Sequence, residues 1–455
     1  MTENKPLKFC STNLKAPVVT FREALLKGIA PDRGLYMPEF IPAVSRDELE
    51  SFAGMNYPQI ANVIIGKYLK GEIDEDVLEM LIHDAYNFNL PLEHVTGRKY
   101  IMRLDQGPTA SFKDFAARMM GRLMNHYLGK SKQKLLILTA TSGDTGSAIA
   151  NAFYGLDNIG VVVLFPENEV TLRQRKQMTT LGKNIQIISM DGKFDDCQAL
   201  VKEAFADPAL FHLNLSSANS INIGRLIPQS VYYFYAQAQL RKQVDEEVVF
   251  SVPSGNFGDM MGGVLAMNMG LPVKKFVIAT NANDVFPKYL ASGKYEKIVP
   301  SRNCISSAMN VGHPSNMARL VALYGGAMDE TGYISRNADM LKLKRDIFAV
   351  SVDDDQTRES IRQAWNTYKL LLEPHGAVGW KGLTSYLDSH PEDHTRLCVS
   401  LETAHPAKFP EEIVRILGFD PPLPDSLQSI ENLDEKYDQL EATYSHFKDY
   451  LISRF

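Results

Sequence analysis

The chain has 455 residues, of which 45% are hydrophobic and 22% charged, and its formal net charge is −6. This length favours two or three lobes, and the composition is that of a globular protein. The acidic balance excludes a general nucleic-acid binder, because no basic excess is available to displace counterions.

The cysteines and the N-terminus bear on the compartment. The chain has no Cys-x-x-Cys pair, and its four cysteines lie far apart: Cys10, Cys197, Cys304 and Cys398. This spacing favours free thiols in a reducing compartment over a disulfide framework or a zinc site. No apolar run reaches the about 18 residues of a membrane span, and residues 1–6 lack the apolar core of a signal peptide. We therefore expect a soluble cytoplasmic protein with no membrane partner.

The pattern of apolar residues changes near Lys99. Residues 1 to 95 are expected to be mainly helical, because segments such as 21–26 and 57–68 space their apolar residues three to four apart. Beyond Lys99, short β-rich runs alternate with helical stretches, which is typical of a parallel sheet covered by helices. The expected strands are 134–139, 160–165, 184–189, 247–252, 275–279, 346–351 and 396–401, and clear helices are 228–242 and 357–368. From Glu431 we expect a charged amphipathic helix or a pair of turns on the surface.

Lys113 lies between two aromatic residues in the run Gly107-Pro-Thr-Ala-Ser-Phe-Lys-Asp-Phe115. Its aromatic neighbours indicate a partly desolvated ammonium group, and desolvation lowers a lysine pKa toward the range where the neutral amine is a nucleophile. A lysine that forms a Schiff base with an aldehyde needs this property. A lysine that only extends its ammonium group to solvent at a helix start has a similar local sequence, so the segment alone leaves both interpretations open.

Strand 134–139 runs into the hydroxyl-rich loop Thr139-Ala-Thr-Ser-Gly-Asp-Thr-Gly-Ser147 and then into a helix. Hydroxyls and free backbone N–H groups at a helix start form a neutral cup for an anion such as a carboxylate. The alternative is a helix N-terminus with more capping residues than it needs.

A second glycine loop follows strand 247–252 and reads Pro253-Ser-Gly-Asn-Phe-Gly-Asp259. A strand, a glycine turn and a helix start bring backbone N–H groups and the positive end of the helix dipole to one point, which suits a phosphate. Gly255 and Gly258 permit a close approach. The loop matches neither a Walker A motif nor the Gly-x-Gly-x-x-Gly spacing, and Asp259 must point away from a phosphate or cap the helix. A plain structural turn is the alternative.

The last expected strand ends in Glu402-Thr-Ala-His-Pro-Ala-Lys-Phe-Pro410. Loops at the carboxyl ends of parallel strands converge on the ligand crevice of an open α/β sheet. Thr403 can present a hydroxyl to that crevice, and His405 and Lys408 can offer further donors. The alternative is a capped strand end without a role in binding.

These four segments occur together in one order: 111–115, 142–146, 254–259 and 403–409. The set resembles the threonine synthases, which are pyridoxal-phosphate enzymes of the tryptophan-synthase β-subunit fold (fold type II). The resemblance covers nearly the whole chain, including 21–39 and 219–229. It implies an α/β fold with two open, mainly parallel sheet lobes and a mainly helical N-terminal domain. The implied domains are an N-terminal domain 1–95, a large cofactor-binding domain 96–113 with 216–455, and a small α/β domain 114–215.

The resemblance also implies roles for site residues. Lys113 carries pyridoxal 5′-phosphate as a Schiff base, and Thr403 faces the pyridine nitrogen as a neutral hydroxyl. The cofactor phosphate is expected on Gly255, Asn256, Phe257, Gly258 and Asp259. The substrate α-carboxylate is expected on Ser142, Gly143, Asp144 and Thr145.

The implied reaction converts O-phospho-L-homoserine and water to L-threonine and phosphate, the last step of threonine biosynthesis. Lys113 is displaced by the substrate amine, removes the Cα proton and moves protons at Cβ, while phosphate leaves from Cγ and water adds at Cβ. The substrate phosphate needs a second anion site. Arg225 with Asn219 and Asn222 is our first choice, followed by Lys408.

Other functions remain open. Within the same chemistry, the chain could be a phospho-lyase or a serine/threonine dehydratase that releases 2-oxobutyrate, and a dehydratase needs no second phosphate site. A non-catalytic binding protein would not require Lys113. A metal site in His390-Pro-Glu-Asp-His394 is disfavoured, because Pro391 breaks the helix that would place both histidines on one face. We expect no metal, and we interpret the aromatic run 232–235 as a buried helix face.

Three segments depart from the family pattern. The chain reads Ser11-Thr-Asn-Leu14 where Ser-Thr-Arg-Gly is common, and Arg33 stands where glycine is usual. Both departures lie in the expected N-terminal domain, so they bear on its packing more than on the chemistry. Segment 309–316 matches only partly, which bears on substrate selectivity. The sequence leaves a monomer and a homodimer equally open.

Overall fold

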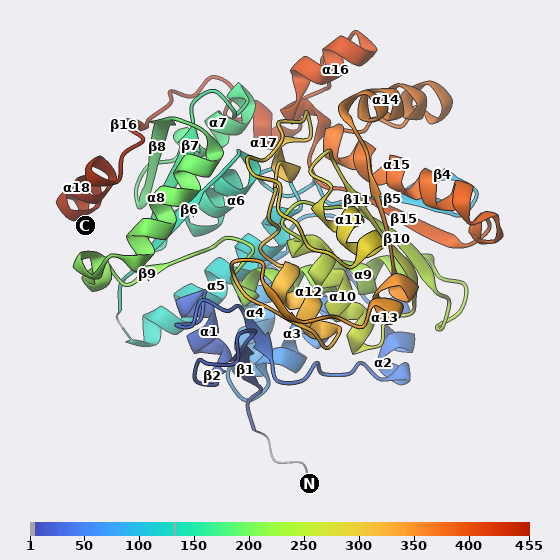
Figure 1. The fold of residues 1–455 in the computed structure, drawn as a ribbon, viewed down its shortest axis with the longest axis horizontal. Coiled ribbons are helices and arrows are strands. Elements are labelled where there is room, and N and C mark those ends of the chain that lie inside the picture. Colours follow the sequence, from blue (N-terminus) through green and yellow to red (C-terminus); the bar gives the residue numbers. More distant parts are fainter. Residues whose placement is uncertain (1–4, 132) are drawn as a thin grey trace.

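Two separate sheets form the frame of the molecule, seen on opposite sides of Figure 1. The computed structural model describes residues 5–131 and 133–455. The six-stranded sheet has the order β14-β11-β10-β15-β5-β4 and is parallel except for β4 at its edge. Its strands are β4 (Leu92–Thr96), β5 (Lys99–Arg103), β10 (Val248–Pro253), β11 (Val273–Thr280), β14 (Ile347–Ser351) and β15 (Leu397–Glu402).

The second sheet is fully parallel and has the order β16-β8-β7-β6-β9. Its strands are β6 (Leu135–Ala140), β7 (Ile159–Pro166), β8 (Ile185–Asp191), β9 (Leu215–Ser216) and β16 (Asp438–Glu441). The seven strands expected from apolar runs are all confirmed, with ends within two residues of those expected. These strands can be recognised from apolar runs in the sequence because central strands such as β10 and β15 are buried along their whole length, so both of their faces are apolar.

Helices cover both sheets. Those associated with the smaller sheet are α6 (Asp144–Phe153), α7 (Leu172–Thr179) and α8 (Phe194–Ala206). Those of the remaining chain are α5 (Lys113–Ser131), α9 (Ile223–Leu240), α10 (Gly258–Met269), α11 (Val285–Ser292), α12 (Met317–Leu323), α13 (Met340–Asp346), α14 (Asp354–Tyr368), α15 (Pro374–Ser389), α16 (Pro410–Leu417) and α17 (Asp425–Gln428). The described residues include the short 3₁₀ helices η1 (Phe52–Gly54), η2 (Pro208–Leu213), η3 (Ser307–Met309), η4 (Pro391–Asp393) and η5 (Pro406–Lys408). A hairpin joins β12 (Ala327–Met328) to β13 (Ile334–Arg336). Within the described ranges, no helix combines the length and apolarity that a bilayer crossing requires.

The N-terminal region is helical, as expected, but it also contains a small antiparallel sheet. Its helices are α1 (Phe21–Lys27), α2 (Arg46–Ser51), α3 (Tyr57–Leu69) and α4 (Glu75–Ala85), and its strands are β1 (Lys8–Ser11), β2 (Val19–Thr20) and β3 (Tyr36–Pro38). Thr20, Ser45 and Asn56 each begin a helix with a reciprocal capping box. The two- to four-residue strands were too short to show an alternating pattern.

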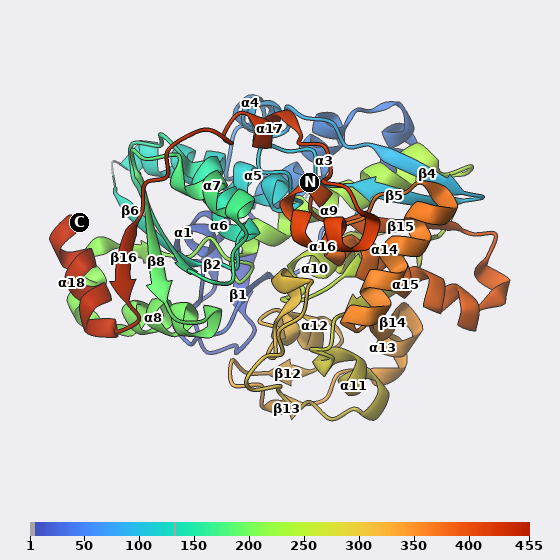
Figure 2. The same cartoon turned by 90° about the horizontal axis from the view of Figure 1, so that it is seen from above.

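The C-terminal segment differs from the expectation. The resemblance implies that 216–455 belongs to the large domain, but β16 pairs with β8 and α18 (Tyr444–Arg454) packs on α8, at the edge of the smaller sheet in Figures 1 and 2. Phe447 and Leu451 are buried there. A strand of four residues with a single aliphatic side chain gives no apolar alternation, so its sequence resembled a charged surface turn. The other domain boundaries stay predictions.

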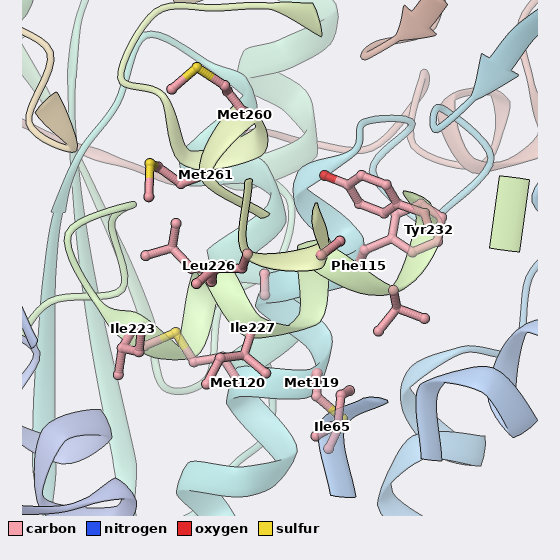
Figure 3. Close-up of a cluster of buried hydrophobic side chains, with 14 of the residues drawn as sticks. Ile65, Phe115, Met119, Met120, Ile223, Leu226, Ile227, Tyr232, Met260 and Met261 are labelled. Carbon is pink, nitrogen blue, oxygen red and sulfur yellow. The ribbon is translucent and has the colours of Figure 1, made fainter. Parts of the chain in front are cut away.

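The core beneath the site packs α5 against α9 and α9 against α10, and Figure 3 shows this cluster. Phe115 of α5 lies against Tyr232 of α9, and Met120 of α5 lies beside Ile227 of α9. The predicted buried aromatic face of α9 is confirmed, because Tyr232, Tyr233 and Phe234 are inaccessible to solvent. This packing holds the first turn of α5 in place.

Candidate active site

One cavity of about 1400 Å³ opens where strands of both sheets end. The segments after β6, β10 and β15 supply Ser142, Gly255 and Thr403 to its wall, and the start of α5 supplies Lys113. Carboxyl ends of parallel strands are the usual place for a ligand crevice in open α/β sheets. The structure therefore brings together the four sequence segments that we expected to form one site.

The turn before Lys113 is fixed to the end of β15. The backbone N–H of Phe112 donates to the carbonyl oxygen of Thr403 at 2.9 Å. Ser111 forms an isolated antiparallel bridge with Ala404. Lys113 and Thr403 are consequently held on adjoining parts of the cavity wall.

Asp114 closes the same turn from the other side. Its carboxylate accepts hydrogen bonds from the backbone N–H of Thr109 at 2.8 Å and from the Thr109 hydroxyl at 2.6 Å. A Cβ atom added to Gly107 would lie 2.4 Å from Oδ2 of Asp114, so only glycine fits there. The lysine thus starts its helix from a rigid turn.

Lys113 is 9% exposed, and its Nζ lies 4.6 Å from the centroid of the Phe112 ring. Burial lowers the Lys113 pKa to about 8, and the nearby cations Lys408 and Arg225 act in the same direction. Asp144 opposes them, with Oδ2 at 3.9 Å from Nζ. A substantial fraction of the amine is therefore neutral near physiological pH, as a Schiff-base lysine requires.

The loop after β10 forms a cradle at the start of α10. Phe257 has a left-handed backbone with φ of +63°, and α10 begins at Gly258. The first N–H groups of α10 have no partner within the helix, so they are free for an anion. A Cβ added to Gly255 would lie 2.9 Å from Cα of Met309 and 3.0 Å from the carbonyl oxygen of Ala308. The cradle is thus closely bounded and suits a phosphate.

Asp259 turns its carboxylate toward α9. Oδ1 accepts hydrogen bonds from the hydroxyls of Tyr232 at 2.5 Å and Tyr233 at 2.7 Å. Oδ2 is buried without a partner among the described residues, and burial raises the Asp259 pKa to about 6. Because the carboxylate of Asp259 is bonded to these hydroxyls, its expected electrostatic repulsion of a phosphate in the cradle is much reduced. The sequence did not reveal the role of the two tyrosines.

Thr403 is buried, and its hydroxyl faces a carboxylate behind the cavity wall. Its Oγ1 lies 3.4 Å from Oε1 of Glu373, the residue that caps the start of α15. Oε2 of Glu373 lies 2.5 Å from Nδ1 of His375, which lines the cavity. Neither Glu373 nor His375 was expected at the site. The one feature visible in the sequence is a glutamate before a proline, which can cap a helix. It does not indicate that Glu373 lies near Thr403.

The loop after β6 is shaped by hydrogen bonds to Thr141. Its Oγ1 accepts from the backbone N–H groups of Gly143 at 2.9 Å and Gly146 at 2.8 Å. Gly143 has a φ of +124°, and an added Cβ would lie 2.6 Å from the side chain of Gln174. Ser142 and Thr145 line the cavity beside the start of α6. Their role as a cup for the substrate carboxylate stays a prediction.

Asp144 lines the cavity, but one oxygen of its carboxylate is engaged by the buried side chain of Lys408. Lys408 is fully buried and does not line the cavity; its Nζ lies 2.6 Å from Oδ1 of Asp144 and donates to the carbonyl oxygen of Thr109. Burial disfavours ionisation of Asp144, but the charges of Lys408 and Lys113 outweigh it and hold its pKa well below the ordinary value. The cup is therefore not made of neutral groups alone, and Lys408 is not placed to bind the substrate phosphate.

Of the three residues chosen first for the substrate phosphate, two line the cavity. Arg225 is 3% exposed, donates from one terminal nitrogen to the carbonyl oxygen of Ala218, and has a buried Nε without a partner among the described residues. Oδ1 of Asn219 is also buried and unpartnered within that set. Asn222 instead caps α9 and donates to the carbonyl oxygen of Leu25, so it is a structural residue. Arg225 thus offers an unneutralised guanidinium, and burial lowers its pKa to about 10.

The two N-terminal departures from the family pattern lie close to the cavity, whose lining includes Thr12 and Arg33. Leu14 and Arg33 both have a left-handed backbone, with φ of +57° and +64°. Arg33 lies 3.8 Å from the carboxylate of Glu330, to which Asn13 also donates. Arg33 and Glu330 line the cavity, so the departure at Arg33 bears on the site and not only on N-terminal packing.

The alternative metal site is not assembled. The imidazoles of His390 and His394 lie 3.0 Å from the carbonyl oxygens of Tyr386 and Leu387, respectively. Over the described ranges, no cluster of three or more His, Cys, Asp or Glu side chains is arranged to hold a metal ion. All four cysteines are free thiols.

Comparisons with known proteins agree with this geometry. Residues 88–401 match the family model of pyridoxal-phosphate dependent enzymes, residues 8–86 match the threonine synthase N terminus, and residues 376–451 match the threonine synthase C-terminal model. A threonine synthase of Haemophilus influenzae is 39% identical over 97% of this chain and 99% of that protein. That of Escherichia coli is 37% identical over 96% and 97%.

The chain belongs to the threonine synthase family. A threonine synthase structure from Brucella melitensis, with pyridoxal phosphate bound, superposes with a TM-score of 0.91 at 34% identity and covers 98% of both chains. The yeast enzyme gives 0.89 at 32% identity with the same coverage. These matches confirm the predicted fold class, the pyridoxal-phosphate cofactor and the assignment as a lyase of this family.

The residues of this cavity fit pyridoxal phosphate. The tightly bounded cradle at Gly255 and Gly258 suits the phosphate, the amine of Lys113 suits the aldehyde, and the hydroxyl of Thr403 suits the ring nitrogen. Polar atoms of Arg225 and Asn219 remain unpartnered in the same cavity. The cavity therefore offers polar groups for an anion in addition to the cradle at 255–259.

Proposed function

We propose that this chain converts O-phospho-L-homoserine and water to L-threonine and phosphate, with the cofactor attached to Lys113. The observation that carries this proposal is the combination of one nucleophilic lysine with two separate anion positions in one cavity. The cradle at 255–259 takes the cofactor phosphate, and the guanidinium of Arg225 takes the substrate phosphate. A dehydratase acting on an unphosphorylated amino acid would have no use for the second position.

Each part of the site has a task in this reaction. When bound, pyridoxal phosphate supplies an electron sink that acidifies the substrate carbons. Lys113 removes the proton from Cα and moves protons at Cβ, since its amine and ammonium forms are both accessible near pH 8. Ser142 and Thr145 receive the substrate carboxylate, and Arg225 with Asn219 holds the phosphate until it leaves from Cγ. The wall of the cavity limits the entry of water other than the one that adds at Cβ.

The cofactor contacts complete the proposal. Gly255, Asn256, Phe257, Gly258 and Asp259 contribute the cradle, in which Asp259 acts through its tyrosine contacts and not as a direct phosphate ligand. Thr403 faces the pyridine nitrogen, with Glu373 behind it. We also propose a cytoplasmic location and leave the oligomeric state as a monomer or a homodimer, for which sedimentation of the purified protein is the direct measurement.

The test is to incubate the purified, cofactor-loaded protein with O-phospho-L-homoserine and to quantify threonine, phosphate and 2-oxobutyrate. We expect threonine and phosphate in equal amounts. Phosphate with 2-oxobutyrate would instead support a phospho-lyase, and turnover of serine or threonine to oxo acids would support a dehydratase. Absence of all products would reject the proposal.

A further inference from the structure

The buried ion pair between Lys408 and Asp144 is not explained by substrate binding. Lys408 has no exposed surface, and its ammonium group lies 2.6 Å from Oδ1 of Asp144. Oδ1 also accepts a hydrogen bond from Nε2 of Gln174 at 2.9 Å. Removing two charges from water is costly, so a pair of this kind indicates a task beyond stability.

The pair joins the two sheet units at the cofactor lysine. Asp144 begins α6 after strand β6, whereas Lys408 ends η5 after strand β15. Nζ of Lys408 also donates to the carbonyl oxygen of Thr109, in the turn that precedes Lys113. Lys408 therefore ties the start of α6 to the turn that carries the reactive lysine.

The two carboxylate oxygens of Asp144 face different partners. Oδ2 lies 3.9 Å from Nζ of Lys113, while Oδ1 is occupied by Lys408 and Gln174. Asp144 is 3% exposed and stays ionised. An ionised carboxylate at this distance favours the protonated form of an amine, and a cation behind the carboxylate offsets part of that effect.

We infer that Asp144 sets the protonation of Lys113 during the reaction, and that Lys408 is a positioning residue that aims and partly neutralises the Asp144 carboxylate. The inference rests on the proposed role of Lys113 and deepens it. When Lys113 takes the proton from the substrate carbon, the resulting ammonium group faces Oδ2 of Asp144, and the proton stays on nitrogen until it is returned to carbon. Because Lys408 neutralises Asp144, the neighbouring Ser142–Thr145 cup can accept a substrate carboxylate without full repulsion.

Other charged groups around Lys113 must be considered in any test. Those that act on it are Asp144 of α6, Lys408 of η5, Arg225 of α9, Asp259 of α10 and Glu373 at the start of α15. Of these, only Asp144 forms an ion pair with Nζ within 4 Å among the described residues. Variants at 144 and 408 therefore probe the nearest charge and its counterion.

The experiment measures how the reactivity of Lys113 depends on pH in the full chain, prepared without cofactor. Acetic anhydride acetylates neutral amines, and mass spectrometry quantifies acetylation of the Lys113 peptide between pH 6 and 10. The wild-type midpoint is expected near pH 8. Asp144→Asn should lower it by about one pH unit, and Lys408→Met should raise it by a similar amount.

Controls separate this role from a structural one. Arg175→Met removes another ion pair, between α7 and Glu435, and should leave the Lys113 midpoint unchanged. If Lys408→Met does not fold, Asp144→Asn decides alone, because its amide preserves the shape of the side chain. A midpoint in Asp144→Asn equal to that of the wild type would overturn the inference. Since the labelling uses neither substrate nor cofactor, its outcome is independent of whether the proposed reaction occurs.

Discussion

The ring of Phe115 packs edge-on against the ring of Tyr232, with centroids 5.5 Å apart and an interplanar angle of 76°. Phe115 lies two residues after Lys113, and the hydroxyl of Tyr232 donates to Asp259 beside the phosphate cradle. One buried aromatic contact therefore connects the first turn of α5, which carries Lys113, to the loop that forms the cofactor cradle. The chemistry of this site depends on core packing as well as on the polar groups that face the cavity.

The first prediction concerns this contact. Phe115→Ala should lower the free energy of unfolding by about 3–5 kcal/mol, because it leaves a cavity among several aromatic rings. Urea denaturation followed by circular dichroism measures the change. The matched control is Phe40→Ala, since Phe40 is 65% exposed and its loss should cost less than about 0.5 kcal/mol. Equal effects in the two variants would contradict the assigned packing.

The second prediction separates the two phosphate positions. Arg225→Gln should raise the KM for O-phospho-L-homoserine by about 100-fold, since it removes a buried charged donor to the substrate phosphate, while the affinity for pyridoxal phosphate stays unchanged. Steady-state kinetics and cofactor titration by absorbance measure the two quantities. Arg46→Gln, at an exposed pair on α2, is the control. Loss of cofactor affinity with an unchanged KM would assign Arg225 to the cofactor phosphate instead.

The third prediction concerns the ring nitrogen. Thr403→Val keeps the shape of the side chain but removes the hydroxyl, so the cofactor should still bind while kcat falls by about 10- to 100-fold. Thr403→Ser should restore most of the rate. Absorbance spectra of the loaded variants report whether the electronic state of the cofactor has changed. A wild-type spectrum and rate in Thr403→Val would remove this residue from the site.

The fourth prediction is a dependence of stability on pH. The folded-state pKa of Asp259 is raised to about 6, so the folded chain binds this proton more tightly than the unfolded chain, and stability falls as pH rises from about 4 to 6. Asp259→Asn removes this loss of stability, which is about 3 kcal/mol when burial raises a pKa from about 4 to about 6. Urea denaturation of the cofactor-free variant and wild type at pH 4 and pH 7 measures the difference. The variant should gain relative to wild type at pH 7, whereas exposed Asp157→Asn should not.

Much of the fold was predictable because its signals are local. Strands such as β10 and β15 are apolar on both faces, and their ends carry glycine or threonine segments with clear chemical meaning. Lys113 was identified from its aromatic neighbours together with those segments. The common position of these segments follows from a general property of parallel sheets, in which the carboxyl ends of strands meet at one edge.

The remaining features depend on contacts between distant segments. Glu373 reaches Thr403 from the start of another helix, and Lys408 pairs with Asp144 across the two sheet units. No periodicity or local motif encodes such a pairing. Strand β16 is not apparent from the sequence. An exposed edge strand is held by backbone hydrogen bonds and needs few apolar side chains, so it shows no apolar pattern. Charge and polarity predict Lys408 and Asn222 as substrate ligands, whereas in the structure these groups hold other side chains and backbone in place.

The central claim is that Lys113 carries the cofactor. The most direct measurement is reduction of the cofactor-loaded protein with borohydride, followed by mass spectrometry of its peptides. We predict that a single phosphopyridoxyl group is found on Lys113, and that Lys113→Ala shows no reducible cofactor band. A label on another lysine, or unchanged labelling in Lys113→Ala, would contradict the account.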